Sequence, residues 1–250
     1  MFEIRDLSKS FRLHHQGGIE IPVMKDAGFS VSRGECVALT GPSGVGKSTV
    51  LRLLYGNYLL QEGQITIGDL DLGKANSRDI LAMRHHQLGY VSQFLRVLPR
   101  ISTLQVVTEP MRNAGMPNAP AERRAKDLLE QLRIPPALWG ISPLTFSGGE
   151  QQRVNIARGM GPQYPALLLD EPTASLDQQN RATVLELIRE AKTNGAAIIG
   201  IFHDAAAREA VCDREIDVGA FRPSVSAVSY THLRAHETGR NLVCRLLREK

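Results

Sequence analysis

The stretch Gly41-Pro42-Ser43-Gly44-Val45-Gly46-Lys47-Ser48-Thr49 decides the fold of this 250-residue chain. It has the form G-x-x-x-x-G-K-[ST], follows an apolar strand-like run at residues 35–40 and precedes helical periodicity from 47 to about 55. Glycines in such a turn let backbone N–H groups approach a phosphate, and the helix N-terminus adds its positive dipole. We expect Lys47 to contact terminal phosphates and the Ser48 hydroxyl to bind Mg²⁺.

A second apolar run ends in two acidic residues and supplies the other half of a phosphate site. Residues 166–170 predict a buried strand whose last residue is Asp170, and Glu171 follows directly. We expect Asp170 to hold Mg²⁺ through water and Glu171 to accept a proton from an attacking water. Such a pair often only caps the next helix, but its combination with the glycine-rich loop favours the catalytic interpretation.

The segment Ser147-Gly148-Gly149-Glu150 allows two interpretations. Ser147 and Glu150 match a capping box, which begins many helices. Consecutive glycines behind a capping serine also expose backbone N–H groups at a helix N-terminus, which is an anion site. The segment lies in a predicted helical region and is not expected to reach the phosphate loop of its own chain, whereas a second chain related by a two-fold axis brings it there. This arrangement predicts ATP bound between two chains.

The rest of the chain indicates an α/β fold with an insertion. Residues 1–35 alternate like antiparallel strands, with a turn at 14–18, and further strands are expected at 64–68 and 88–91. Helical patterns cover 103–113, 121–132 and 149–158, after which strand and helix alternate at 166–170, 180–192 and 197–202. We therefore predict a parallel sheet core with an N-terminal antiparallel β subdomain and an α-helical subdomain inserted at about 95–160.

With these motifs in order, the chain resembles an ATP-binding-cassette ATPase over residues 1–218. The resemblance implies a P-loop NTPase with a RecA-like core, ATP and Mg²⁺ as ligands, and a homodimer or pseudo-dimer joined through the ATP sites. It also implies that Gln93 senses Mg²⁺ and the γ-phosphate, that Asp177 lies in a loop crossing the interface, and that His203 contacts the γ-phosphate. Phe11 stands where the family usually stacks an aromatic ring on adenine, and a core role for this residue stays open.

These assignments form one predicted site. The nucleotide-binding residues are Phe11, Gly41, Pro42, Ser43, Gly44, Val45, Gly46, Lys47, Ser48, Thr49, Ser147, Gly148, Gly149, Glu150 and Asp177, the catalytic residues are Glu171, His203 and Gln93, and the metal ligands are Ser48, Gln93 and Asp170.

The segment that resembles the family signature departs from it at two positions. The family usually has leucine and glutamine where this chain has Phe146 and Glu150. Phenylalanine keeps an apolar anchor. Glutamate places a negative charge one turn from the phosphate-facing N–H groups, although a carboxylate in a first helical turn also suits the helix dipole. We expect ATPase activity to survive, at a changed rate.

Charge and composition give no support to several classes of protein. Residues 221–250 carry six basic and two acidic side chains, which account for the whole net charge of +4. The body is neutral, so the charge gives no argument for nucleic acid as a partner. The longest apolar run falls short of the about 20 residues that span a bilayer, and three widely separated cysteines predict reduced thiols in the cytoplasm. Residues 219–250 lose periodicity, and we interpret them as an atypical tail, non-native or disordered.

The partner is indicated by a closer resemblance. The stretch Val91-Ser-Gln-Phe-Leu-Arg-Val-Leu-Pro-Arg-Ile-Ser102 resembles the ATP-binding-cassette subunit of the carbon–phosphorus lyase system, as do residues 54–58, 146–158 and 190–204. That resemblance implies soluble lyase subunits as partners and a role in forming α-D-ribose 1-(alkyl)phosphonate 5-triphosphate from ATP and an alkylphosphonate. The alternative is the ATP-binding subunit of a membrane transporter of the lipoprotein-export type, with a permease as partner.

Overall fold

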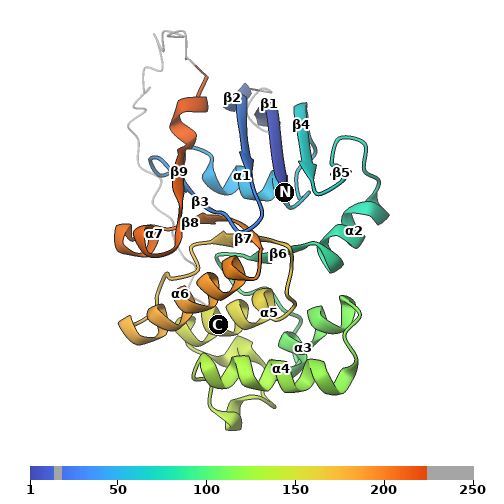
Figure 1. The fold of residues 1–250 in the computed structure, drawn as a ribbon, viewed down its shortest axis with the longest axis vertical. Helices are drawn as coiled ribbons and strands as arrows, with labels where there is room; N and C mark the ends of the chain where they lie inside the picture. Colours follow the sequence, from blue (N-terminus) through green and yellow to red (C-terminus); the bar gives the residue numbers. More distant parts are fainter. Residues whose placement is uncertain (14–18, 224–250) are drawn as a thin grey trace, which may run out of the picture.

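A parallel sheet forms the centre of the computed structural model, which describes residues 1–13 and 19–223 (Figure 1). The strand order is β6-β7-β8-β3-β9, and every neighbouring pair is parallel. β7 and β8 are buried along their whole length, as expected for strands covered on both faces. The strands are β3 (Cys36–Thr40), β6 (Leu88–Val91), β7 (Ala166–Asp170), β8 (Ala197–Ile201) and β9 (Arg214–Asp217).

An antiparallel sheet lies beside this core. Its order is β2-β1-β4-β5, and all its pairings are antiparallel. The predicted N-terminal strand pair is present, whereas its predicted turn at 14–18 falls outside the described residues. The strands are β1 (Phe2–Leu13), β2 (Ile19–Val31), β4 (Glu62–Ile67) and β5 (Leu70–Asp71).

The helices divide into those that connect the sheets and those of the insertion. α3, α4 and α5 lie between β6 and β7 in the chain and form the lower part of the molecule in Figure 1. The α-helices are α1 (Lys47–Leu54), α2 (Ser77–His86), α3 (Thr103–Asn113), α4 (Asn118–Gln131), α5 (Gly148–Met160), α6 (Gln178–Thr193) and α7 (Ala205–Val211). Short 3₁₀ turns are η1 (Pro136–Leu138), η2 (Pro143–Thr145) and η3 (Val218–Phe221).

Each face of the parallel sheet belongs to a different hydrophobic core. Strand alternation sends Val37, Leu39 and Leu168 into a core shared with α1 and the antiparallel sheet. The intervening residues, such as Ala38 and Leu167, enter a second core with α3 to α6. As a result, α1 and α5 pack on opposite faces of the sheet. The phosphate loop before α1 and the Ser147 segment before α5 therefore lie on different faces of the sheet.

The predicted fold class is confirmed, and the elements missed are short or polar. α2 has one buried residue, Met83, so its apolar stripe is too weak to recognise, although Asn76 and Asp79 form a capping box at its start. α7 and β9 were not predicted, because Ala205–Val211 and Arg214–Asp217 are too short for periodicity to show. No helix in the described part of the chain is long and apolar enough to cross a bilayer.

The predicted tail is mostly outside what the structure describes. Residues 224–250 are not described, so the interpretation of them as non-native stays a prediction. Just after the predicted domain end at 218, η3 continues to Phe221, whose ring stacks on Phe29 of β2 with centroids 6.4 Å apart.

Candidate functional site

The phosphate loop joins β3 to α1 in a shape that only glycine fits at key points. Gly46 has φ of 114°, and a Cβ built there would lie 2.7 Å from Cγ1 of Val23. Gly46 is also the N-cap of α1, and no side chain caps that terminus. The first N–H groups of α1 therefore point into the loop without a side-chain acceptor, which is the arrangement that binds phosphate.

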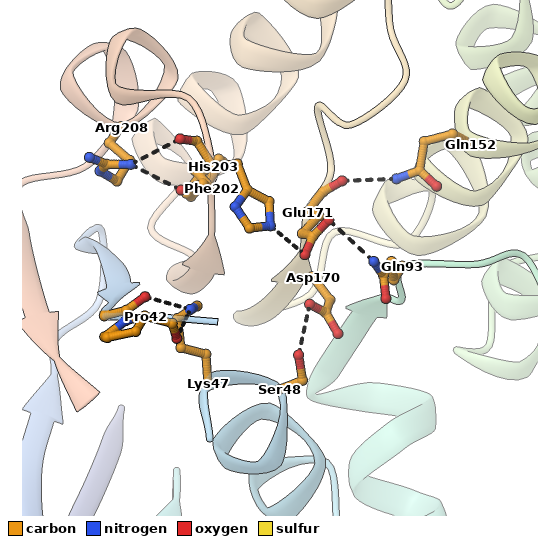
Figure 2. Close-up of polar contacts among 11 residues, drawn as sticks. Pro42, Lys47, Ser48, Gln93, Gln152, Asp170, Glu171, Phe202, His203 and Arg208 are labelled. Atoms are coloured by element: carbon orange, nitrogen blue, oxygen red, sulfur yellow. Dashed lines mark hydrogen bonds and ion pairs between the residues drawn. The ribbon is translucent and has the colours of Figure 1, made fainter. Parts of the chain in front are cut away.

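Lys47 reaches across the same loop. Its Nζ donates to the carbonyl oxygens of Gly41 at 2.7 Å and Pro42 at 2.9 Å (Figure 2). The ammonium is thus held over the loop by weak acceptors that a phosphate oxygen, carrying full negative charge, can replace. The structure places this predicted residue in the loop as the sequence motif requires.

Two hard oxygen donors meet where α1 begins and β7 ends. Ser48 Oγ donates to Oδ1 of Asp170 at 3.4 Å, and the Tyr90 hydroxyl donates to Oδ2 of the same carboxylate at 3.3 Å. Asp170 is buried, and this burial, followed by the charge of Glu171, raises its pKa. Hydroxyl and carboxylate oxygens suit Mg²⁺, so the donor set of Ser48 and Asp170 fits that ion.

Glu171, which follows β7, contacts side chains that follow two other strands, β6 and β8. Its Oε1 lies 2.6 Å from Nε2 of His203, after β8, and its Oε2 accepts from Nε2 of Gln93 at 3.3 Å, after β6 (Figure 2). Its backbone adopts φ of 56°, which turns the chain sharply after β7. The carboxylate is largely buried, with 18% of the side chain exposed, whereas the His203 side chain is 66% exposed. The geometry therefore offers Glu171 as a proton acceptor and places the exposed His203 ring in hydrogen-bond contact with it.

Three further side chains that sequence reasoning missed support these residues. Gln152 Nε2 donates to the backbone oxygen of Glu171 at 3.3 Å, and Arg208 Nη1 donates to the backbone oxygens of Phe202 at 3.1 Å and His203 at 3.4 Å. Tyr90 is the third, through Asp170. Gln152 was recognisable as a polar residue on the buried side of a predicted helix, where an amide needs a partner. Arg208 carried no comparable signal.

The Ser147 segment is a complete capping box. Ser147 accepts from the Glu150 N–H at 3.4 Å, and Glu150 Oε2 accepts from the Ser147 N–H at 3.0 Å and its hydroxyl at 2.6 Å. The hydroxyl contact, followed by the backbone contact, lowers the pKa of Glu150. Because α5 and α1 occupy opposite faces of the sheet, this segment stays apart from the phosphate loop of its own chain.

Two other predicted residues have local partners. Asp177 is the N-cap of α6 and accepts from the Asn180 N–H at 2.8 Å, a bond that is the main cause of its lowered pKa. Phe11 packs edge-to-face on Tyr58, with ring centroids 5.3 Å apart, and Lys9 Nζ lies 5.3 Å from its ring. The structure therefore brings Lys47, Ser48 and Asp170 together, and Gln93, Glu171 and His203 together, while Phe11, Ser147 and Asp177 engage separate neighbours.

Comparison with known proteins identifies related chains. The family model described as ABC transporter matches residues 24–174. The lipoprotein-releasing system ATP-binding protein LolD of Legionella pneumophila (strain Paris) is 38% identical over 197 residues, covering 78% of this chain and 86% of that protein. An uncharacterized ABC transporter ATP-binding protein of Thermotoga maritima is 33% identical over 204 residues, covering 82% and 87%.

Solved structures agree at the level of the fold. The ATP binding subunit of an ABC transporter superposes with a TM-score of 0.76 at 28% identity, covering 88% of this chain and 87% of that one. A dimeric post-hydrolysis state of the cassette MJ0796, bound to ADP and Pi, gives 0.79 at 24% identity, covering 88% and 95%. The named relatives favour the transporter alternative, and nothing in these comparisons shows a relationship to the carbon–phosphorus lyase system.

Proposed function

Since the chain belongs to the ABC transporter family of ATP-binding proteins, we propose that it hydrolyses ATP at sites shared between two copies of itself or a close paralogue. The observation that carries this proposal is the convergence of Gln93, Glu171 and His203 beside the phosphate loop (Figure 2). The loop binds the phosphates through the N–H groups of α1 and through Lys47, which exchanges the Gly41 and Pro42 carbonyls for phosphate oxygens.

Residues for the metal ion are present at the same place. Ser48 and Asp170 would hold Mg²⁺. Gln93 contacts Glu171, the residue next to Asp170, and would be a third ligand. When bound, Mg²⁺ neutralises charge on the phosphates. Tyr90 positions the Asp170 carboxylate through its hydroxyl, and burial of that carboxylate strengthens its attraction to a cation.

Proton transfer falls to Glu171. Its carboxylate accepts a proton from the water that attacks the γ-phosphate, because it is the acidic side chain at the carboxyl end of β7 that is not engaged with Ser48. Gln93 and His203 hold it from either side and orient it. Because the His203 side chain is largely exposed, it can exchange its contact with Glu171 for a contact with charge that develops on the phosphate.

A second subunit completes the site. The anion site that Ser147, Gly148 and Gly149 form at the start of α5 lies on the other side of the sheet from α1, so a partner related by a two-fold axis would bring it to ATP. The dimeric state of the MJ0796 cassette supports this assembly by analogy of fold. Glu150 in α5 and Asp177 at the start of α6 belong to helices that pack on the same face of the sheet, and both would border the interface.

For the partner, we favour the permease of a membrane transporter, with the chain attached at the cytoplasmic face. The support is the 38% identity to a lipoprotein-releasing ATP-binding protein. The carbon–phosphorus lyase complex stays as a second candidate on one observation, the sequence of residues 91–102. There Phe94 and Leu98 are 69% and 74% exposed, and Phe94 borders a groove of about 730 Å³ together with Arg52, Arg84 and Arg96. Exposed apolar side chains beside a groove are typical of a partner site.

Co-purification distinguishes the two partners. The full chain, tagged and photo-crosslinked through a probe placed at Leu98, is recovered from cells grown on an alkylphosphonate, and its adducts are identified by mass spectrometry. A polytopic membrane protein supports the transporter, and soluble lyase subunits support the second candidate. The matched control is Phe94→Ser with Leu98 still carrying the probe, which should lose the adduct and keep ATP binding. Adducts to neither class contradict both assignments.

The ATPase itself is tested separately. Purified chain should release phosphate from Mg²⁺-ATP at a rate that rises with more than the first power of its concentration, because two chains make each site. Lys47→Ala should lower ATP affinity by roughly 10- to 100-fold, the value of a charge-assisted bond to phosphate. A rate that is strictly first order in protein, from a demonstrated monomer, contradicts the shared site.

A further inference from the structure

Two cysteines far apart in the chain lie against each other in the fold. Cys36, the first residue of β3, and Cys212, the residue after α7, have their Sγ atoms 3.6 Å apart. Cys36 is fully buried, whereas Cys212 is partly exposed. The separation of 176 positions explains why sequence spacing gave no sign of the pair. A disulfide requires the sulfurs to close from this distance to about 2.05 Å.

The backbone holds the pair in register. The Cys36 N–H donates to Oδ2 of Asp213 at 2.9 Å, and the Asp213 N–H donates to the Cys36 carbonyl at 2.8 Å. The parallel ladder between β3 and β9 begins at the next residues, where Val37 pairs with Arg214. Because these bonds join Cys36 to Asp213, the residue next to Cys212, the two thiols stay adjacent as long as the central sheet is intact.

The two thiols differ in chemical character. The hydrogen bond between them lowers the pKa of Cys212, against burial and against the charges of Asp213 and Glu215, while Lys192 assists. The same bond, together with burial, raises the pKa of Cys36. Thiolate is the form that attacks an oxidant, and it must also be reachable. Cys212 therefore meets an oxidant first, and Cys36, shielded by the sheet, reacts only with its neighbour.

We propose that Cys36 and Cys212 form an intrachain disulfide when the chain meets a peroxide. The Cys212 thiolate attacks one peroxide oxygen, the O–O bond breaks, and a sulfenic acid and water result. The Cys36 sulfur then attacks the Cys212 sulfur, its proton leaves with the departing hydroxide as a second water, and the S–S bond forms. Two thiols lose two electrons, and one peroxide gains them.

This bond would cross-link two segments that lead into the ATP site. β3 runs directly into the phosphate loop at Gly41, and α7 follows His203 and Asp204. The bond would close a loop containing most of the chain, and long loops constrain the unfolded state strongly. A core role, in which Cys36 acts only as a small apolar side chain, predicts instead that the pair is inert.

The test uses the full chain with Cys244→Ser, so that Cys36 and Cys212 are the only thiols. After treatment with one to two equivalents of hydrogen peroxide, titratable thiols should fall from two to none. Mass spectrometry without reductant should find the peptides of both cysteines joined, lighter by two hydrogens. The thermal midpoint should rise by about 5–10 °C, and dithiothreitol should reverse the rise.

Two variants keep the outcome clear. Cys36→Ala should leave Cys212 trapped as a sulfenic acid that dimedone labels, and Cys212→Ser should leave Cys36 unreactive until the chain is unfolded. Both keep the backbone bonds of Asp213. Thiols that both survive peroxide, oxidation of Cys212 without any crosslink to Cys36, or a crosslink between two chains would each overturn the proposal.

Discussion

Nε2 of His203 lies 2.6 Å from Oε1 of Glu171, so the imidazole and the carboxylate share one hydrogen bond at the ends of adjacent strands. The other carboxylate oxygen accepts from Gln93, and the residue therefore has both oxygens held before any ligand arrives. A proton acceptor fixed on two sides is already oriented for one direction of attack, which is what a general base requires.

Replacing that base tests its role. Glu171→Gln preserves the size of the side chain and one oxygen acceptor but cannot take a proton. Phosphate release should fall by roughly 10²–10⁴-fold, while ATP binding, measured by equilibrium dialysis, should be kept. Glu186→Gln, which alters an exposed glutamate paired with Arg189, is the matched control and should leave turnover unchanged. Full turnover in Glu171→Gln would remove this carboxylate from the mechanism.

The contact also predicts that the two residues act as a unit. His203→Ala should lower turnover by itself, and adding it to Glu171→Gln should cost much less than the product of the two separate losses. The measurement is a double-mutant cycle on the rate of phosphate release at saturating ATP. Losses that multiply fully would mean that His203 works independently of Glu171.

The capping box at α5 gives a pH-dependent prediction. The pKa of Glu150 is lowered in the folded chain, so its ionised form contributes stability above the pKa of the unfolded chain and loses it as pH falls through the folded value. Glu150→Gln cannot titrate. The wild-type advantage in unfolding free energy, about 1 kcal/mol or less for a capping carboxylate, should be present at pH 7 and decline as the pH falls below about 4.3, the ordinary pKa of glutamate.

Denaturant titrations of both chains at several pH values measure this difference, since other groups titrate equally in the two. An advantage that stays constant from pH 7 to pH 3 would contradict the assignment of the charge to the capping box.

Close packing between α5 and β6 predicts a stability effect. A Cβ on Gly159 would lie 2.5 Å from Cγ2 of Val91, so Gly159→Ala should destabilise the fold by about 1–3 kcal/mol although alanine favours helix. Gly140→Ala is the matched control, because no atom lies within 4 Å of a Cβ there, and it should stay within about 0.5 kcal/mol. Chemical denaturation reports both. Since Gln93 follows Val91 closely, Gly159→Ala should also slow turnover.

The motifs around phosphate chemistry could be predicted because each has a local cause. The glycines at 41 and 46, the buried strand before Asp170 and the serine at 147 all act within a few residues of themselves, and the structure places each where its pattern indicated. The central strands were recognised for the same reason. α3 and β6 begin and end at the predicted residues, because Ser102 caps the helix and β6 is a short apolar run.

What escaped prediction depends on contacts between distant segments. Arg208 contacts the carbonyl of His203 through the tertiary fold, which no periodicity encodes. Cys212 lies against Cys36 because β9, which follows it, pairs with β3. Tyr90 acts on Asp170 because β6 and β7 are neighbours, and that order follows from topology rather than spacing. The identity of the partner belongs to this group as well, since exposed Phe94 and Leu98 do not specify who covers them.

The backbone of Glu171 has a φ of 56°, so the residue proposed as the proton acceptor also lowers the stability of the fold. An L-residue with a Cβ in this left-handed region loses roughly 1–2 kcal/mol that glycine would keep. Glycine at this position would regain that free energy but would remove the proposed proton acceptor. A related chain that no longer needs to hydrolyse ATP would be expected to carry glycine or asparagine at this position and to have a higher melting temperature. A related chain that combines a raised melting temperature with no ATP hydrolysis would then be recognised as one that has lost this glutamate.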